Sequence, residues 1–169
     1  MTPRRLAVAL ALLVALPALW TGWSSDRRRI EARLEELADA VEKSAPEGAL
    51  EAVAAARAVT GVFAEPFEIR AAEAGFTTRE RQDLMRFVHR YRSTSERIAV
   101  DIAVESLDIA GAHSRATMVA TFLFRSGGPL GDSTERYRVQ ANWVEREGEW
   151  KIDYIDLLEI VQGDGRLGF

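Results

Sequence analysis

Few side chains in this 169-residue sequence could carry chemistry. It contains no cysteine, which excludes disulfides, thiolate nucleophiles and cysteine-ligated zinc. His89 and His113 are the only histidines, and nothing in their spacing supplies the other ligands that a metal site needs. No nucleophile-elbow pattern or phosphate-binding loop occurs. We therefore predict no metal and no cofactor, and we interpret both histidines as surface residues.

Carboxylates on segments with strand-like alternation are the remaining candidates for acid–base chemistry. Asp101 and Glu105 alternate with apolar residues, so we interpret them as part of a solvated face. Asp153 shares a face with Ile155 and Leu157, although a mixed face at a sheet edge explains this pattern as well as catalysis does. The sequence therefore predicts no catalytic residue, and Asp153 is not expected to be an essential base.

The charge distribution separates the first 29 residues from the rest of the chain. Residues 1–29 hold five of the 22 basic residues and one of the 26 acidic ones, so the remainder carries 17 basic and 25 acidic side chains, a net charge of −8. Nucleic-acid binding draws most of its affinity from basic side chains on phosphates. An acidic body of this size therefore predicts one globular domain that does not bind nucleic acid.

Helical spacing dominates the segment between residues 30 and 92. Ser44 with Glu47, and Thr77 with Glu80, have the spacing of capping boxes and predict two helix starts. We expect helices over residues 30–43, 44–63 and 77–92, with a brief extended piece, "PFEIRA", over residues 66–71.

From residue 96 the hydrophobic period changes to two, which is typical of strands. We expect strands over residues 97–109, 115–125, 135–146 and 149–160. Glu147-Gly148 suits a tight hairpin turn between the last two, and the segment 115–125 is apolar on both faces, as a central strand covered on both sides would be. The pattern predicts an α+β fold in which helices pack on one face of a curved antiparallel sheet.

This order of elements, closed by the hairpin "WVEREGEWKIDYIDL", resembles the nuclear transport factor 2 superfamily, also called SnoaL-like. The resemblance implies a cone with a pocket, covering residues 30–162 and followed by a tail over residues 163–169. That superfamily includes ketosteroid isomerase and dehydratase-like enzymes, and also members that only bind or assemble.

Bulky residues at helix and strand spacing should form the core, and some of them should line the cone. The ligand-binding residues predicted on this basis are Phe87, Tyr91, Met118, Phe122, Trp143 and Asp153. Trp150 follows the tight turn and alternates with Ile152, so we expect it to be buried and structural.

Residues 6–23 contain no charge and would span about 27 Å as a helix, close to the thickness of a bilayer core. A signal-peptidase cut after Ala18 would have Leu16 at position −3, which is a poor site. We therefore predict a retained signal anchor over residues 1–29 rather than a cleaved signal. Basic residues after the span outnumber those before it, which alone would keep the domain in the cytoplasm. A short basic lead before an early hydrophobic segment is, however, the layout of an export signal, and we give this more weight. The predicted location is the inner membrane, with one span and the domain on the periplasmic or extracytoplasmic side.

Three function classes remain open. The favoured one is a membrane-anchored, non-enzymatic binding domain of the bacterial cell envelope that holds a small apolar ligand or an envelope protein. The second is an isomerase or dehydratase of the ketosteroid isomerase type. The third is an assembly subunit resembling the VirB-type secretion component, and a homodimer is compatible with it.

Overall fold

The computed structural model describes residues 25–110, 114–128 and 131–163. Residues 25–41, the first that the structure describes, are helical and are called the N-terminal helix below. The elements after it are α2 (Ala49–Gly61), β1 (Phe63–Ala71), the 3-10 turn η1 (Ala72–Ala74), β2 (Phe76–Thr78), α3 (Arg81–Thr94), β3 (Arg97–Ile109), β4 (Arg115–Gly128), β5 (Gly131–Arg146) and β6 (Glu149–Gln162).

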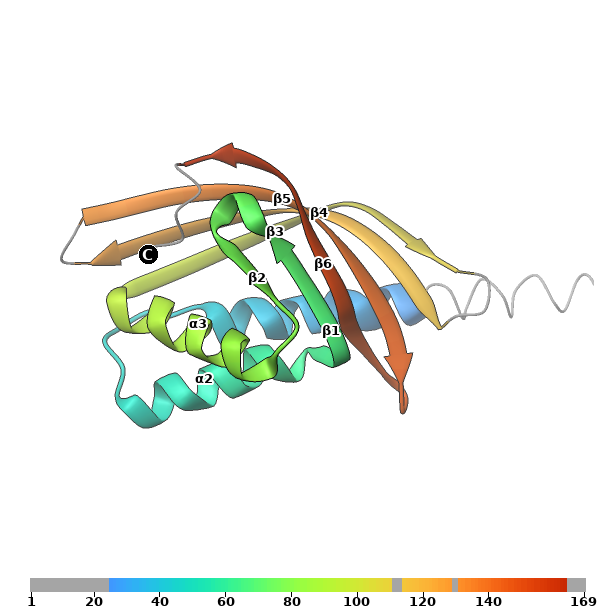
Figure 1. Cartoon of the computed structure of the whole chain (residues 1–169), viewed down its shortest axis with the longest axis horizontal. Helices are drawn as coiled ribbons and strands as arrows, with labels where there is room; N and C mark the ends of the chain where they lie inside the picture. Colours follow the sequence, from blue (N-terminus) through green and yellow to red (C-terminus); the bar gives the residue numbers. More distant parts are fainter. Residues whose placement is uncertain (1–24, 111–113, 129–130, 164–169) are drawn as a thin grey trace, which may run out of the picture.

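The six strands form one sheet in the order β2-β1-β6-β5-β4-β3 (Figure 1). The antiparallel meander β3 to β6 confirms the prediction for the second half of the chain. The expectation of a wholly antiparallel sheet is wrong, because β1 runs parallel to β6 and the sheet is therefore mixed. The amide of Ile152 donates to the carbonyl of Val62 at 2.9 Å, where β1 joins the sheet after α2. The segment expected as a brief extended piece is thus a nine-residue strand.

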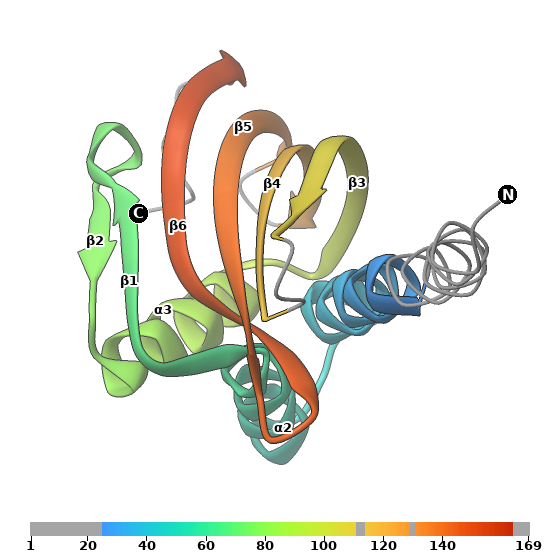
Figure 2. The same cartoon turned by 90° about the vertical axis from the view of Figure 1, so that its right-hand side faces the viewer.

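The sheet is strongly curved, and its concave face holds the helices. Figure 2 shows β3 to β6 arching away from the three helices, which all lie on one side of the arch. Irregular register between Val104 and Ser106, and at three places between β5 and β6, allows the long strands to bend. The structure has the predicted α+β cone architecture.

The outer face of the sheet differs from the expectation for strand 115–125. Val119 and Leu123 lie half-buried on that face among polar neighbours, and within the described ranges no helix covers them. Two ion pairs cross this face, one between Asp101 and Arg125 and one between Glu105 and Arg138. Long polar side chains therefore shield the apolar residues that we expected a second layer to cover.

Both predicted capping boxes are wrong, and the helices begin later than the sequence pattern indicates. At α2 the cap is Gly48, whose amide donates to the Glu51 carboxylate at 2.8 Å. At α3 the threonines belong to β2, and the Thr78 hydroxyl accepts from the amide of Glu80 at 3.0 Å. Threonine is β-branched, so pairing with β1 suits it better than the first turn of a helix.

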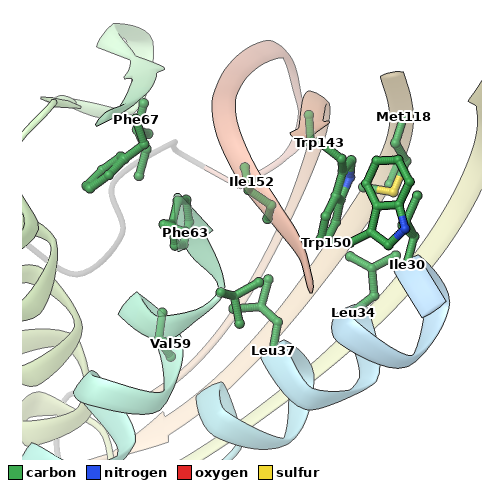
Figure 3. Close-up of a cluster of buried hydrophobic side chains, with 14 of the residues drawn as sticks. Ile30, Leu34, Leu37, Val59, Phe63, Phe67, Met118, Trp143, Trp150 and Ile152 are labelled. Atoms are coloured by element: carbon green, nitrogen blue, oxygen red, sulfur yellow. The ribbon is translucent and has the colours of Figure 1, made fainter. Parts of the chain in front are cut away.

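The N-terminal helix packs its apolar stripe against the last hairpin. Figure 3 shows Ile30 and Leu34 beside Trp150, with Leu37 further along the same helix. Trp150 is only 1% exposed, which confirms the prediction that it is structural, and its Nε1 donates to Asp26 at 3.4 Å. Glu147 and Gly148, both with positive φ (54° and 80°), form the tight turn that sets this register.

Among the described residues, none of the helices has the length and hydrophobicity to cross a membrane. The predicted anchor, residues 6–23, lies outside the described residues, as does the predicted tail beyond Gly163.

Candidate ligand-binding pocket

A cavity of about 210 Å³ lies between the concave sheet face and the helices. Side chains from every layer contribute to its walls. The apolar residues include Leu37, Val41, Phe63, Ile69, Ala71, Phe76, Phe87, Met118, Phe122, Phe124, Val139, Ile155 and Leu157. An engineered apolar cavity of about 150 Å³ holds benzene. The cavity in this protein therefore has room for a molecule of one or two small rings.

Four of the six predicted ligand-binding residues line this cavity: Phe87, Tyr91, Met118 and Phe122. Trp143 is fully buried in the main core but is not among the lining residues. That the lining residues bind a ligand stays a prediction.

Asp153 lies outside the cavity, with its carboxylate 3.9 Å from the exposed Arg115 guanidinium. On β6, Ile152 pairs with Trp143 and Tyr154 pairs with Asn142, so Asp153 has no partner on β5 and forms a bulge. This extra residue interrupts the alternation of side chains between the two faces. As a result Ile152 and Ile155 both line the cavity, although they are three residues apart. The shared face that strict alternation predicts for Asp153 and Ile155 does not exist.

One end of the concave face is polar, and the sequence analysis missed it. Residues directly opposite on antiparallel strands point to the same face. Glu135 pairs with Phe124, and Tyr137 pairs with Phe122, so Glu135 follows the lining residues onto the concave side. Glu135 is only 6% exposed, and its carboxylate accepts a hydrogen bond from the Tyr137 hydroxyl. Ser133 lies one step further out on the same face, with its hydroxyl 3.4 Å from that carboxylate.

Tyr91 extends this polar end from the helical side. It lines the cavity from α3, on the side where Ser126 of β4 lies close to its phenol. Burial raises the pKa of the Tyr91 phenol above its ordinary value of 10.0; the hydrogen bond with Ser126 acts in the opposite direction, and the Glu135 carboxylate raises it further. The Phe124 ring makes edge-on contacts with both phenol rings. Its centroid lies 6.4 Å from the centroid of the Tyr91 ring and 6.1 Å from that of the Tyr137 ring. One end of the concave face thus holds a buried carboxylate and several hydroxyl groups, next to a cavity whose wall is apolar.

The sequence did contain a signal for this end. In "ERYRVQANWV", Glu135 has the same parity as Tyr137 and as Trp143, which we predicted to line the cone. A charged residue two positions before an inward tyrosine is therefore on the inward face unless a bulge intervenes.

The cations beside the cavity are used to hold helices together. Arg92 Nη1 donates to the carbonyls of Ala40 and Val41, both at 2.8 Å, and Arg92 also pairs with Glu47 at 2.6 Å. Lys43 Nζ donates to the carbonyl of Arg92 at 2.8 Å, at the end of α3. The N-terminal helix and α3 thus cap each other's C-terminal ends. The Arg92 hydrogen bond lowers the pKa of the Glu47 carboxyl against the opposing effect of burial, and the positive charges of Arg92 and Lys43 lower it further.

Among residues 25–110, 114–128 and 131–163, no group of three or more histidine, aspartate or glutamate side chains is placed so that it could hold a metal ion. His89 is exposed on α3, and His113 lies outside the described residues.

No family model and no curated protein sequence matches this chain. Solved structures do match, at low identity. A proposed scytalone dehydratase from Novosphingobium aromaticivorans is 12% identical with a TM-score of 0.68, over 88% of this chain and 97% of that one. A proposed dehydratase of the nuclear transport factor 2-like family from Streptomyces avermitilis is 12% identical with a TM-score of 0.64, over 83% of this chain and 99% of that one.

A third match is a nuclear transport factor 2-like protein with a cystatin-like fold, also from Novosphingobium aromaticivorans. It is 14% identical with a TM-score of 0.62, over 96% of this chain and 92% of that one. Likeness at this identity shows the fold. The described part of the chain is a cone domain with the nuclear transport factor 2-like fold, as the sequence resemblance implied.

Proposed function

We propose that this chain is a membrane-anchored, non-enzymatic binding domain of the bacterial cell envelope, whose cone holds a small apolar ligand. The cavity of about 210 Å³ in the concave face carries the proposal. Protein interiors are usually packed without voids of this size. Because most of its lining is aliphatic or aromatic, an apolar molecule would bury its surface there at about 25 cal/mol per Å².

Indene, a two-ring hydrocarbon, is a suitable probe for this proposal. We expect the purified full-length chain to bind it in calorimetric titration, with the same buffer and any detergent as the blank. Ala71 lines the cavity and is partly buried, so Ala71→Phe should fill part of the space and abolish binding. Ala103→Phe makes the same change on the exposed face of β3 and should leave binding intact. Absence of indene binding to the wild-type chain would refute the apolar-ligand proposal.

The carboxylate and phenol at the polar end favour a second candidate, an isomerase or dehydratase of the ketosteroid isomerase type. Glu135 is buried beside the Tyr137 hydroxyl, and a carboxylate base and a phenol are the two kinds of group that proton transfer of this type uses. The dehydratase names of two structural neighbours agree with this candidate.

Exchange of the hydrogens next to the carbonyl of 1-indanone in D₂O, followed by NMR, separates the two candidates. A binding domain should leave the exchange at the buffer rate. An enzyme should accelerate it and lose the acceleration in Glu135→Gln, whereas Asp153→Asn should keep it, because Glu135 lies on the concave face beside the lining residue Tyr137 and Asp153 lies beside the exposed Arg115. Acceleration that depends on Glu135 would replace the binding proposal by the enzymatic one.

The membrane part of the proposal places a retained anchor over residues 6–23 and the domain outside the cytoplasm. Trp20 and Trp23 suit the membrane interface, and the arginines from Arg27 onward form a polar border. Intact mass spectrometry of protein extracted from membranes should give the full 169-residue mass. A mass lacking the first 18 to 25 residues would rule out the anchor. Protease added to intact spheroplasts should digest the domain if it lies outside.

A further inference from the structure

We infer that one end of the domain lies against the lipid headgroups of the membrane, and that the half-buried end of the concave face points away from the bilayer. The membrane-facing end consists of residues 25–31, 114–116 and 144–153, which are the start of the N-terminal helix, the start of β4 and the β5–β6 turn with its flanking residues. This inference rests on the anchor in the proposed function and specifies how the domain meets its membrane.

The chain between the predicted span and the first contact with the fold is short. The span ends at Trp23, and a tryptophan at the border of a span lies at headgroup level. Asp26 is three residues further on, so its Cα lies at most about 11 Å from that of Trp23, whatever the conformation between them. With the anchor in the membrane, Asp26 is therefore held in the headgroup layer or just above it.

Side-chain contacts join this first helical turn to the β5–β6 hairpin. Asp26 is only 6% exposed and accepts a hydrogen bond from Trp150 Nε1 at 3.4 Å. Arg29 donates to the carbonyl of Gly148 in the turn and pairs with Glu145 at 3.0 Å. Because the Trp150 side chain is fully buried, the hairpin cannot leave the helix without opening the core. The anchor therefore holds the turn near the membrane together with the helix, and Figure 1 shows both at the same end of the molecule.

The net charge of the membrane-facing end suits a lipid surface better than that of the rest of the domain. This end holds six basic and six acidic side chains, whereas the other residues from 25 to 169 hold 14 basic and 20 acidic ones. Anionic lipids attract basic groups at the membrane surface and repel acidic ones. In the proposed orientation the whole excess of negative charge lies away from the bilayer.

Two arginines at this end lie on the outer face of the sheet and suit lipid phosphates. Arg115 lies opposite Val144, and Arg146 is two positions further along β5, so the two side chains share a face. The Arg115 side chain is 72% exposed and 3.9 Å from the Asp153 carboxylate, and Arg146 is also exposed. The planar guanidinium group matches the geometry of phosphate oxygens. Both arginines are therefore placed to bind headgroup phosphates.

The half-buried end of the concave face lies at the far end of the long strands. Leu157, which lines the cavity there, is eight residues along β6 from Glu149, about 26 Å of strand. Asp132 is 14 residues along β5 from Arg146, about 46 Å of strand. Figure 1 shows the start of β5 and the β5–β6 turn at opposite ends of the molecule. In this orientation a ligand reaches the half-buried end from the aqueous side.

Single cysteines can test the orientation, because the chain has no cysteine of its own. Glu149→Cys places a label at the membrane-facing end, and Asp132→Cys is the matched control at the far end. Both replace an exposed acidic side chain, 57% exposed for Glu149 and 84% for Asp132. Each full-length variant carries a nitrobenzoxadiazole fluorophore and is reconstituted in vesicles of phosphatidylethanolamine and phosphatidylglycerol, with and without a lipid that bears a nitroxide on its headgroup.

We expect the nitroxide lipid to lower the fluorescence of the label on residue 149 about twofold or more, since that label lies at the headgroup layer. The label on residue 132 should keep its fluorescence. Equal quenching of the two labels, or stronger quenching at residue 132, would overturn the inference. Flotation of the vesicles in a density gradient separates the two failures. A chain that floats without quenching at residue 149 contradicts the inference alone, whereas a chain that does not float lacks the anchor and also contradicts the membrane part of the proposed function.

Lengthening the connection assigns the contact to the short tether. Twenty Gly/Ser residues inserted after Trp23 would add a flexible linker with a mean span of about 22–27 Å, so quenching at residue 149 should fall to the level at residue 132. The same insertion after Thr2, before the span, is the control and should leave quenching unchanged. Undiminished quenching with the linker after Trp23, or an equal fall with both insertions, would overturn the assignment to the tether.

Discussion

The two ends of the concave sheet face differ in how completely they are filled. At one end the N-terminal helix presses Ile30 against Trp143, Trp150 and Met118, and all four side chains are fully buried. At the other end Phe122, Phe124 and Leu157 are only half-buried and surround the cavity. The same strands thus provide packing at one end and unfilled space at the other. Removing a side chain should therefore cost much more stability at the filled end.

Trp150→Ala should give the largest effect and tests the filled end directly. The substitution removes a fully buried indole and leaves a cavity, so we expect a loss of about 3–5 kcal/mol in the free energy of unfolding. Urea denaturation of the full-length chain measures it. A loss below about 1 kcal/mol, the range of surface substitutions, would contradict the packing shown in Figure 3.

Arg92→Leu should cost about 3 kcal/mol, because it leaves the Glu47 carboxylate and the last carbonyls of the N-terminal helix without their buried partner. Arg92 lies where α3 contacts the C-terminal end of the N-terminal helix. Arg90→Leu, on the exposed side of α3, is the control and should change the free energy of unfolding by less than about 0.5 kcal/mol. Similar losses in the two variants would mean that the Arg92 contacts contribute little.

Leu34→Ala and Leu157→Ala make the same chemical change at the two ends. Leu34 is buried in the main core, whereas Leu157 is half-buried beside the existing cavity. We expect Leu34→Ala to cost about 3 kcal/mol and Leu157→Ala about 1 kcal/mol, since part of the Leu157 side chain has no packing partner to lose. Equal losses, measured by urea denaturation, would show that the open end is packed as well as the filled one.

Glu47→Gln should have the smallest effect of these substitutions, about 0.5 kcal/mol at pH 7, and the effect should depend on pH. The pKa of Glu47 is lowered in the folded protein from its ordinary value of 4.5, chiefly by the Arg92 hydrogen bond. A lowered folded-state pKa stabilises the protein above the unfolded-state pKa, and this contribution is lost as the pH falls through the folded-state value. The difference between wild type and Glu47→Gln should therefore shrink below about pH 4.5. A constant difference from pH 7 to pH 3 would contradict the ion pair.

Local patterns predicted the antiparallel meander, the tight Glu147-Gly148 turn and the burial of Trp150. Each of these depends on residues close together in sequence, where side-chain periodicity and turn chemistry act directly. The predicted helix over residues 30–43 was also found, because its apolar stripe has a clear period.

The parts that were missed depend on contacts between distant segments. The parallel pairing of β1 with β6 joins residues about 90 positions apart and has no local signature. Glu47 matches a capping box in sequence, yet in the fold it pairs with Arg92. The bulge that moves Asp153 out of the cavity shifts the face by one residue, which strict alternation cannot anticipate. Where no bulge intervenes, alternation holds: extending it from Tyr137 to Glu135 on β5 would have placed Glu135 on the concave face.

The contact between the first described helix and the last hairpin also sets an order of events during synthesis. Asp26 and Trp150 are 124 residues apart, so at about 5–20 residues per second the helix waits about 6–25 s before its partner is made. During that interval the stripe formed by Ile30, Leu34 and Leu37 lacks its native cover, and it remains without it in any chain that stops before β6. The filled end can therefore form only after β6 has been synthesised, which is late in translation. A chain that ends before β6 would expose an apolar helix suited to recognition by chaperones and proteases.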